Sequence, residues 1–268
     1  MTTNVDGSAE HFCTAAGSGV PKTIYSLWLQ GREAAPDLVR FNFERWEALN
    51  PDYRLKVLDR HGVLDLFEGV DLPIRDLPTQ ALSDVVRARL LCDDGGVWVD
   101  ASVVPLKPLS QWLDDALTEA GFFAFERPGP DRPISSWFLA ATPQNLIFRA
   151  WWKQIERFWS KPRRLIQGIP ADPVASVSPN GATEDDQFPY FWFHYLFQYL
   201  LESDMEFAET WNKCARMAAG PPHRLQALFA NTPRPSVADI RSAASAAPMQ
   251  KLTWRVSYPL DVLTAALS

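Results

Sequence analysis

The chain has 268 residues, of which 47% are hydrophobic and 22% are charged, a balance typical of one large α/β domain that can bury a sizeable core. Its net charge of -6 argues against a nucleic-acid-binding protein, because such proteins present a basic patch or stripe. The cysteines are few and widely spaced, which argues against a disulfide framework and against a cysteine-based zinc site.

No segment of the chain has the pattern of a membrane-targeting or membrane-spanning element. The first 20 residues lack a basic start followed by an apolar run, so we expect no signal peptide. The most hydrophobic stretch, 188–201, is interrupted by polar residues and is shorter than the roughly 20 apolar residues that span a bilayer. We therefore expect a cytoplasmic protein. Peripheral contact of the basic run 161–164 with acidic lipid at the inner face of the membrane is an alternative to a solvated helix end.

Strands and helices alternate along the chain, which is typical of an α/β fold with parallel strands. Residues 1–19 are small and polar, without a hydrophobic period, and predict a flexible tail. Hydrophobic periodicity and turn residues predict strands at 23–29, 53–58, 97–99, 103–106 and 122–125. They predict helices at 36–49, 61–70, 79–93, 113–121, 143–160 and 188–197.

Prolines punctuate two further segments, 127–135 and 168–181. Both are predicted to be loops, and we expect the first to be mobile and to face a ligand. Beyond Pro222 the alanine-rich sequence is only weakly patterned and predicts no defined element.

The segment 81–109 carries the strongest functional signal, because a helix, a glycine turn, a short apolar strand and Asp100 follow one another directly. Asp100 would lie at the carboxyl end of the strand, where open α/β sheets bind ligands. Gly95 and Gly96 would permit a sharp bend and close approach of a ligand. Asp84 and Arg87, three residues apart, would share one helix face. The ordinary alternatives are a turn-capping aspartate and a surface ion pair.

These residues carry a resemblance. The sequence SDVVRARLLCDDGGVWVDASVVPLKPL resembles glycosyltransferases with a sugar-binding region containing a DXD motif. It is more similar to their capsular polysaccharide synthesis relatives, which replace the second aspartate by a small hydroxyl residue, as Ser102 does here. PKTIYSLWLQG at 21–31 resembles the family's opening strand, FPYFWFHYLF at 188–197 its aromatic helix, and PMQKLTW at 248–254 its closing motif. Four matches in the family's order make the resemblance specific.

The resemblance implies a GT-A-type nucleotide-diphospho-sugar transferase fold, with a mixed, mostly parallel sheet flanked by helices. It implies one domain over 20–268, with a nucleotide-sugar half at about 20–125 and an acceptor and closing half at about 126–268. The implied function is transfer of a hexose from a nucleotide-diphosphate sugar, a UDP-sugar, to a glycan or lipid-linked acceptor in bacterial surface polysaccharide synthesis. The anomeric configuration would be retained.

Site residues follow from the same resemblance. The catalytic residues would be Asp100, Asp84 and Arg87. Contacts to the nucleotide sugar would come from Trp28, Gln30, Asp84, Arg87, Gly95, Gly96, Asp100, Ser102, Lys251, Thr253 and Trp254. The acceptor side would include Trp137, Asp185 and His194. Without the resemblance, Trp28 would be assigned to the core and His194 to a structural role.

A divalent cation, Mn²⁺ or Mg²⁺, would be held by Asp100 and Ser102 to neutralise the leaving diphosphate. A hydroxyl is a poorer ligand than a carboxylate for a hard cation, so we expect weakened metal affinity. Gln250 stands where histidine is expected in many relatives. These two departures leave open a degenerate protein that binds a nucleotide sugar or glycan without turnover. A phosphoryl-transfer aspartate is a further alternative, which lacks a second acidic cluster downstream.

Overall fold

The structure is a computed structural model, and it describes residues 19–178, 187–232 and 234–267. The predicted tail up to residue 18 lies outside the described residues, and so does Asp185. The division into one domain with two halves stays a prediction.

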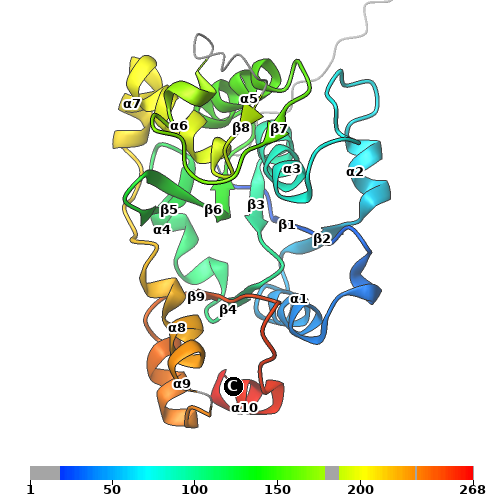
Figure 1. The fold of residues 1–268 in the computed structure, drawn as a ribbon. Coiled ribbons are helices and arrows are strands. Elements are labelled where there is room, and N and C mark those ends of the chain that lie inside the picture. The colour runs from blue at the N-terminus through cyan, green and yellow to red at the C-terminus, as the bar shows by residue number, and fades with distance from the viewer. Residues whose placement is uncertain (1–18, 179–186, 233, 268) are drawn as a thin grey trace, which may run out of the picture.

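A five-stranded sheet in the order β2-β1-β3-β6-β5 forms the centre of the molecule (Figure 1). Its strands are β1 (Thr23–Leu27), β2 (Arg54–Leu58), β3 (Gly96–Val99), β5 (Phe122–Gly129) and β6 (Arg132–Ala141). Strand β1 pairs in parallel with β2 and β3, whereas β6 is antiparallel to both β3 and β5. Four of the five strands therefore run in one direction, and the predicted mixed, mostly parallel sheet is confirmed.

Helices cover both faces of this sheet, because alternate strand residues point to opposite sides. In β3, Trp98 packs in the cluster formed with helices α3, α5 and α6, whereas Val97 and Val99 pack on the other side with Trp46 of α1. The helices are α1 (Asp37–Leu49), α2 (Arg60–Leu66), α3 (Thr79–Asp93), α4 (Leu113–Leu117), α5 (Leu146–Phe158), α6 (Trp192–Ser203) and α7 (Met205–Asn212).

A second, two-stranded sheet continues from the carboxyl end of β3. Strand β4 (Val103–Pro105) pairs antiparallel with β9 (Met249–Lys251), which the chain reaches only near its end. Helices α8 (Arg224–Asn231), α9 (Val237–Ala244) and α10 (Leu260–Leu267) pack beside this sheet, at the end of the molecule opposite α5 to α7 (Figure 1). The sequence beyond Pro222 thus forms defined elements that periodicity alone did not predict.

The predicted loop at 127–135 is wrong, because β5 and β6 continue through it as a hairpin. Prolines argued against strands here, but β5 is the edge strand of the sheet, and β6 pairs with β3 only from Phe138 onward. Strand edges tolerate proline, since no ladder hydrogen bond is lost there. Two short strands, β7 (Arg164–Leu165) and β8 (Gln187–Phe188), also pair in parallel. Short 3-10 helices lie at Arg32–Ala34, Leu109–Gln111, Ala175–Val177 and Pro221–His223.

Within the described parts of the chain, every helix is too short or too polar to cross a lipid bilayer.

Candidate functional site

Asp100 lies where the sequence predicts it, directly after the last residue of β3. Its backbone N–H donates to the carbonyl oxygen of Trp137 at 2.9 Å, which extends the β3–β6 pairing by one residue. Its own carbonyl oxygen accepts from the Val103 N–H at 2.9 Å, which closes a turn into β4. The backbone of Asp100 is therefore fixed by two strands, and its side chain is 27% exposed. A carboxylate held this way can meet a ligand at the sheet edge.

Helix α3 brings two of the predicted residues to the same place. Asp84 and Arg87 are 7% and 4% exposed, so the interpretation as a surface ion pair is wrong. The Arg87 Nη1 atom lies 3.3 Å from Asp84 Oδ1 and donates to the carbonyl oxygen of Ser136 at 2.7 Å. The guanidinium also lies over the ring of Trp98, 4.9 Å from its centroid. These contacts hold the guanidinium in one orientation.

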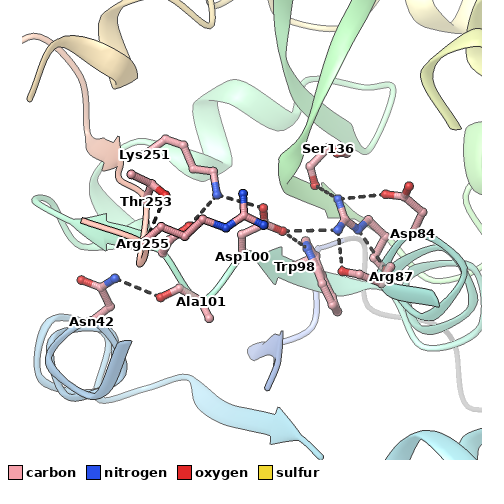
Figure 2. A network of polar contacts seen from close by, with 12 residues as sticks. Asn42, Asp84, Arg87, Trp98, Asp100, Ala101, Ser136, Lys251, Thr253 and Arg255 are labelled. Carbon is pink, nitrogen blue, oxygen red and sulfur yellow. Dashed lines mark hydrogen bonds and ion pairs between the residues drawn. The ribbon is translucent and has the colours of Figure 1, made fainter. Parts of the chain in front are cut away.

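Five side chains form a continuous group that we call the strand-end cluster: Asp84, Arg87, Asp100, Ser102 and Lys251. Figure 2 shows Asp84, Arg87, Asp100 and Lys251 of this cluster. Arg87 Nη2 lies 3.3 Å from Asp100 Oδ1. Lys251 Nζ donates to Asp100 Oδ2 at 3.0 Å and to Ser102 Oγ at 2.6 Å. Helix α3 and the closing motif are far apart in the sequence and both belong to the predicted donor site. They therefore meet at the carboxylate of Asp100.

The two carboxyl groups of the cluster have opposite pKa shifts. Burial would raise the pKa of Asp100, but the charges of Lys251 and Arg87 outweigh this effect and lower it. Burial raises the pKa of Asp84 to about 7, since the neighbouring Arg87 offsets the burial only in part and Asp100 adds a like charge. At neutral pH Asp100 is thus ionised, whereas Asp84 is poised to take up or release a proton.

Strand pairing sets the position of Lys251. Lys251 stands opposite Val103 in the β4–β9 ladder, and the Leu252 N–H donates to the Ser102 carbonyl oxygen at 2.9 Å. Next to it, the fully buried Gln250 accepts from the Leu225 N–H at 2.9 Å and donates to the Pro221 carbonyl oxygen at 3.2 Å. Gln250 therefore anchors β9 to α8 and has a structural role.

Two tryptophans from opposite ends of the chain meet beside the cluster. Trp28 follows β1, and its ring centroid lies 5.5 Å from that of Trp254 in an edge-to-face arrangement. Trp254 is 46% exposed, and the buried Trp28 Nε1 has no partner among the described residues. Thr253 belongs to the same segment, and its backbone N–H lies 3.5 Å from the Tyr258 hydroxyl. Gln30 is exposed in the turn after β1.

The predicted metal ligands do not fit a divalent ion as they are arranged. Lys251 Nζ already donates to both Asp100 and Ser102, so an ammonium group holds the position between the two oxygens. Among the described residues, no group of three or more His, Cys, Asp or Glu side chains is arranged to hold a metal. The metal prediction therefore receives no support from this geometry.

Gly95 and Gly96 have a different role from the predicted contact with a ligand. Both have positive φ, at +66° and +105°. A Cβ atom on Gly95 would lie 2.5 Å from the Pro143 nitrogen, and one on Gly96 would lie 2.9 Å from the Thr23 carbonyl oxygen. They also lie at the start of β3, about 13 Å along the strand from Asp100. The glycines are needed so that backbone can pack against backbone.

The predicted acceptor residues do not join the cluster. Trp137 is 6% exposed and stacks on Phe125 with ring centroids 4.8 Å apart. His194 is buried, and burial together with the charges of Arg132 and Arg87 lowers its pKa to about 3. Its Nδ1 atom has no hydrogen-bond partner in the described structure. His194 is therefore uncharged near pH 7.

A hollow of about 1230 Å³ opens between the β5–β6 hairpin and helices α6 and α7, and the sequence did not predict it. We call it the hairpin hollow. Its lining includes charged and aromatic side chains: Glu126, Arg127, Asp131, Arg132, Trp211 and Arg216. Strand β6 connects it to the strand-end cluster, because Arg132 lines the hollow and Ser136 contacts Arg87. Ser136 lies four positions after Arg132, which is about 13 Å along the strand.

Two contact residues of the cluster were missed at the sequence level. Trp98 Nε1 donates to Asp100 Oδ1 at 3.1 Å, and the Ser83 hydroxyl accepts from Arg87 Nη2 at 2.7 Å. Period-2 alternation would have found Trp98, since it stands two residues before Asp100 on the same strand face. Helical spacing would have found Ser83, which lies one turn before Arg87.

Comparison with known proteins gives consistent results. The sequence matches the family described as "Capsular polysaccharide synthesis protein" over residues 10–168 and 182–262. An O-glycosyltransferase, braB, from Annulohypoxylon truncatum is 28% identical over 59% of this chain and 42% of its own length. An initiation-specific alpha-1,6-mannosyltransferase from Candida albicans is 26% identical over 56% of this chain and 42% of its own length. The chain thus spans less than half the length of these two relatives.

The solved structures that the chain matches are remote in sequence. A glycosyltransferase involved in glycosylation of the major capsid of PBCV-1 has a TM-score of 0.41 at 11% identity, covering 92% of this chain and 98% of that one. An active-site mutant of LgtC has a TM-score of 0.39 at 12% identity, covering 91% of this chain and 94% of that one.

Proposed function

Because the chain belongs to the capsular polysaccharide synthesis protein family, we propose that it is a glycosyltransferase. It would move a hexose from a nucleotide-diphosphate sugar, a UDP-sugar, to a glycan or lipid-linked glycan in bacterial surface polysaccharide synthesis. The single observation that carries the proposal is the strand-end cluster, in which Asp100 joins Arg87 of α3 to Lys251 of β9. Action in the cytoplasm, at the inner face of the membrane, belongs to the same proposal.

The cluster offers groups suited to an activated sugar. Arg87 is a multi-donor fork and Asp84 is an acceptor, the combination that recognises sugar hydroxyls. The partly exposed Trp28 offers an aromatic surface to a nucleobase. Lys251 and the exposed Trp254 belong to the closing motif at 248–254, so they can contact the diphosphate from the side opposite Arg87.

The proposed reaction places negative charge next to fixed cations. The C1–O bond of the donor breaks and its electron pair stays on the β-phosphate oxygen, while the acceptor hydroxyl oxygen bonds to C1 from the same face. The hydroxyl proton passes to the departing diphosphate, so atoms and charge balance. Preorganised positive groups stabilise the charge that develops on the phosphate, which is a main source of catalysis.

The hairpin hollow is the proposed acceptor site. Its exposed charges suit a polyhydroxylated chain, and β6 leads from it to Ser136 beside Arg87. Trp137 of β6 and His194 of α6 would then act indirectly, by supporting the strand and the helix that line the hollow. Asp185 remains an acceptor-side prediction.

A degenerate sugar-binding protein is the alternative function. It was suggested by Ser102 and Gln250, but Ser102 accepts a hydrogen bond from Lys251 and Gln250 anchors β9. Both residues therefore have structural partners, so neither departure from the motif by itself indicates a loss of activity.

Incubation of the purified chain with a panel of nucleotide sugars, followed by detection of the released nucleoside diphosphate, tests the proposal. We expect slow donor hydrolysis without acceptor, since water can replace the hydroxyl. Binding of a nucleotide sugar without any hydrolysis or transfer would instead support the degenerate alternative.

A further inference from the structure

The position between Asp100 and Ser102 is held by the ammonium group of Lys251. Its Nζ atom lies 3.0 Å from Asp100 Oδ2 and 2.6 Å from Ser102 Oγ. These are the two side chains to which a DXD-type site would assign a divalent cation. A metal bound between them would need its oxygens at about 2.0–2.6 Å, the space that the ammonium nitrogen now takes.

Backbone pairing between β9 and β4 fixes the position of Lys251, so its place in the cluster does not depend on its flexible side chain alone. Val103 pairs with Lys251 across the β4–β9 ladder, and the Leu252 N–H bonds to the carbonyl oxygen of Ser102 itself. The buried amide of Gln250 fixes the same strand on its other side. The side chain of Lys251 is 18% exposed, so its conformational freedom is small.

The charge balance of the cluster also disfavours an added dication. Asp100 is already contacted by two cations, Arg87 and Lys251, and accepts a hydrogen bond from the Trp98 indole. Its charge is therefore compensated. Serine at position 102 adds no charge, whereas the aspartate of a DXD motif would supply the second negative charge that a divalent ion requires.

An ammonium group has three N–H donors. Two of them are directed at Asp100 and Ser102, and the third has no partner among the described residues. A phosphate oxygen beside the cluster could accept this third hydrogen bond. Lys251 would then contact the phosphate oxygen that a metal ion would otherwise bind.

We propose that Lys251 takes the place of the divalent cation, so that this chain binds the diphosphate of its donor and transfers the sugar without a metal. The inference rests on the proposed function, because it concerns the charge on the leaving diphosphate. In the step itself, Lys251 donates a hydrogen bond to the β-phosphate oxygen that receives the electron pair of the C1–O bond. Lys251 keeps its proton throughout.

Nucleoside diphosphate binding provides the test. Thermal shift and calorimetric titration would use UDP, GDP, ADP and dTDP, each with EDTA and with MnCl₂. We expect at least one of them to bind equally well in both conditions, because the lysine replaces the ion. Electron paramagnetic resonance of Mn²⁺ with that diphosphate should show the same free and diphosphate-bound metal in the presence of the protein as in its absence.

Substitutions distinguish the lysine from an ordinary surface charge. Lys251→Gln should weaken binding of the diphosphate about 10- to 100-fold, which is the usual worth of a hydrogen bond to a charged group. Lys251→Arg should keep part of the affinity. Lys153→Gln removes an exposed lysine of α5 and makes the same charge change, so it should bind like the unmodified chain.

A second design restores a metal site. The double variant Ser102→Asp with Lys251→Ala removes the ammonium and adds the missing carboxylate, so it should bind Mn²⁺ and should need Mn²⁺ to bind the diphosphate. If the double variant does not fold, the unmodified chain and Lys251→Gln still decide the question.

Three results would overturn the inference. If the unmodified chain binds the diphosphate only with MnCl₂, or retains Mn²⁺ in the resonance experiment, the metal-free site is wrong while the proposed function stands. Unchanged affinity in Lys251→Gln would likewise remove Lys251 from the site. Absence of binding by all four diphosphates in both conditions would overturn the proposed function, and the inference with it.

Discussion

The strand-end cluster and the hairpin hollow are both rich in charge, but they differ in burial and in how firmly each charge is held. In the cluster, Arg87 is 4% exposed and contacts two carboxylates, two serines and a tryptophan ring. In the hollow, the side chain of Arg216 is 35% exposed, and among the described residues it lies 3.7 Å from Glu126 and contacts only one further residue, Trp211, through its ring and its carbonyl oxygen. Burial and many contacts hold the groups of the cluster in one arrangement, whereas the groups of the open hollow are freer to move, so the proposed donor site should be more rigid than the proposed acceptor site.

The largest expected effect follows loss of the central carboxylate. Asp100→Ala leaves Arg87 and Lys251 without their shared partner, and we expect kcat/KM for donor hydrolysis to fall about 100- to 1,000-fold. Steady-state release of nucleoside diphosphate measures this. Asp131→Ala in the wall of the hollow is the matched control, and it should leave donor hydrolysis within about 3-fold of the unmodified chain. Equal losses in both variants would erase the contrast between the two regions.

Stability should show the same contrast between two arginines. Arg87→Ala leaves the buried Asp84 without its neighbouring cation, while Asp100 keeps its ion pair with Lys251, and we expect a loss of about 3 kcal/mol in the free energy of unfolding. Arg216→Ala breaks a partly exposed ion pair and the contacts with Trp211, and it should cost about 1–2 kcal/mol. Urea denaturation of both variants measures the difference. A comparable loss in Arg216→Ala would show that the hollow is as rigid as the cluster.

The pH dependence of stability depends on the sign of the Asp84 shift. The folded-state pKa of about 7 lies above the unfolded value, so the folded chain binds more protons between about pH 4 and pH 7. The contribution of Asp84 to the free energy of unfolding is therefore largest in acid. It declines as the pH rises through that window, by roughly 1 kcal/mol per pH unit. Asp84→Asn should remove this decline, which urea denaturation at several pH values measures. The same slope in the variant would mean that another group titrates.

The smallest effect is expected at the exposed edge of the cluster. Trp254→Ala removes an edge-to-face contact with Trp28, and the KM for the donor should rise about 3- to 10-fold with little change in kcat. Trp112→Ala is unsuitable as a control because that ring is packed against Phe123 in the core. Met205→Ala, at an exposed position of α7, should leave the KM unchanged. A large fall in kcat for Trp254→Ala would place this ring closer to the reacting atoms.

The first part of the fold could be predicted because its signals are local. The helix predicted at 79–93 coincides with α3, and the predicted strand before Asp100 is part of β3. The apolar stripe of α5 is also confirmed, since Ile147, Trp151 and Ile155 are all buried. Helical periodicity and short apolar runs carry this information without knowledge of the tertiary structure.

The remainder depends on contacts between distant segments. The Lys251–Asp100 pair joins residues 151 positions apart through a strand of only three residues, which no periodic pattern reveals. The β5–β6 hairpin was missed because proline tolerance depends on where the sheet ends. Helix α9 was missed because it is short, although the capping box of Ser236 and Asp239 marks its start.

A crystal structure of the chain with a bound nucleoside diphosphate, UDP first, is the most direct test of the proposed donor site. The proposed function predicts a phosphate oxygen within hydrogen-bond distance of Lys251 Nζ, with the nucleobase against Trp28 and Asp100 still bonded to Arg87. A diphosphate bound in the hairpin hollow, or anywhere away from Asp100, would contradict it.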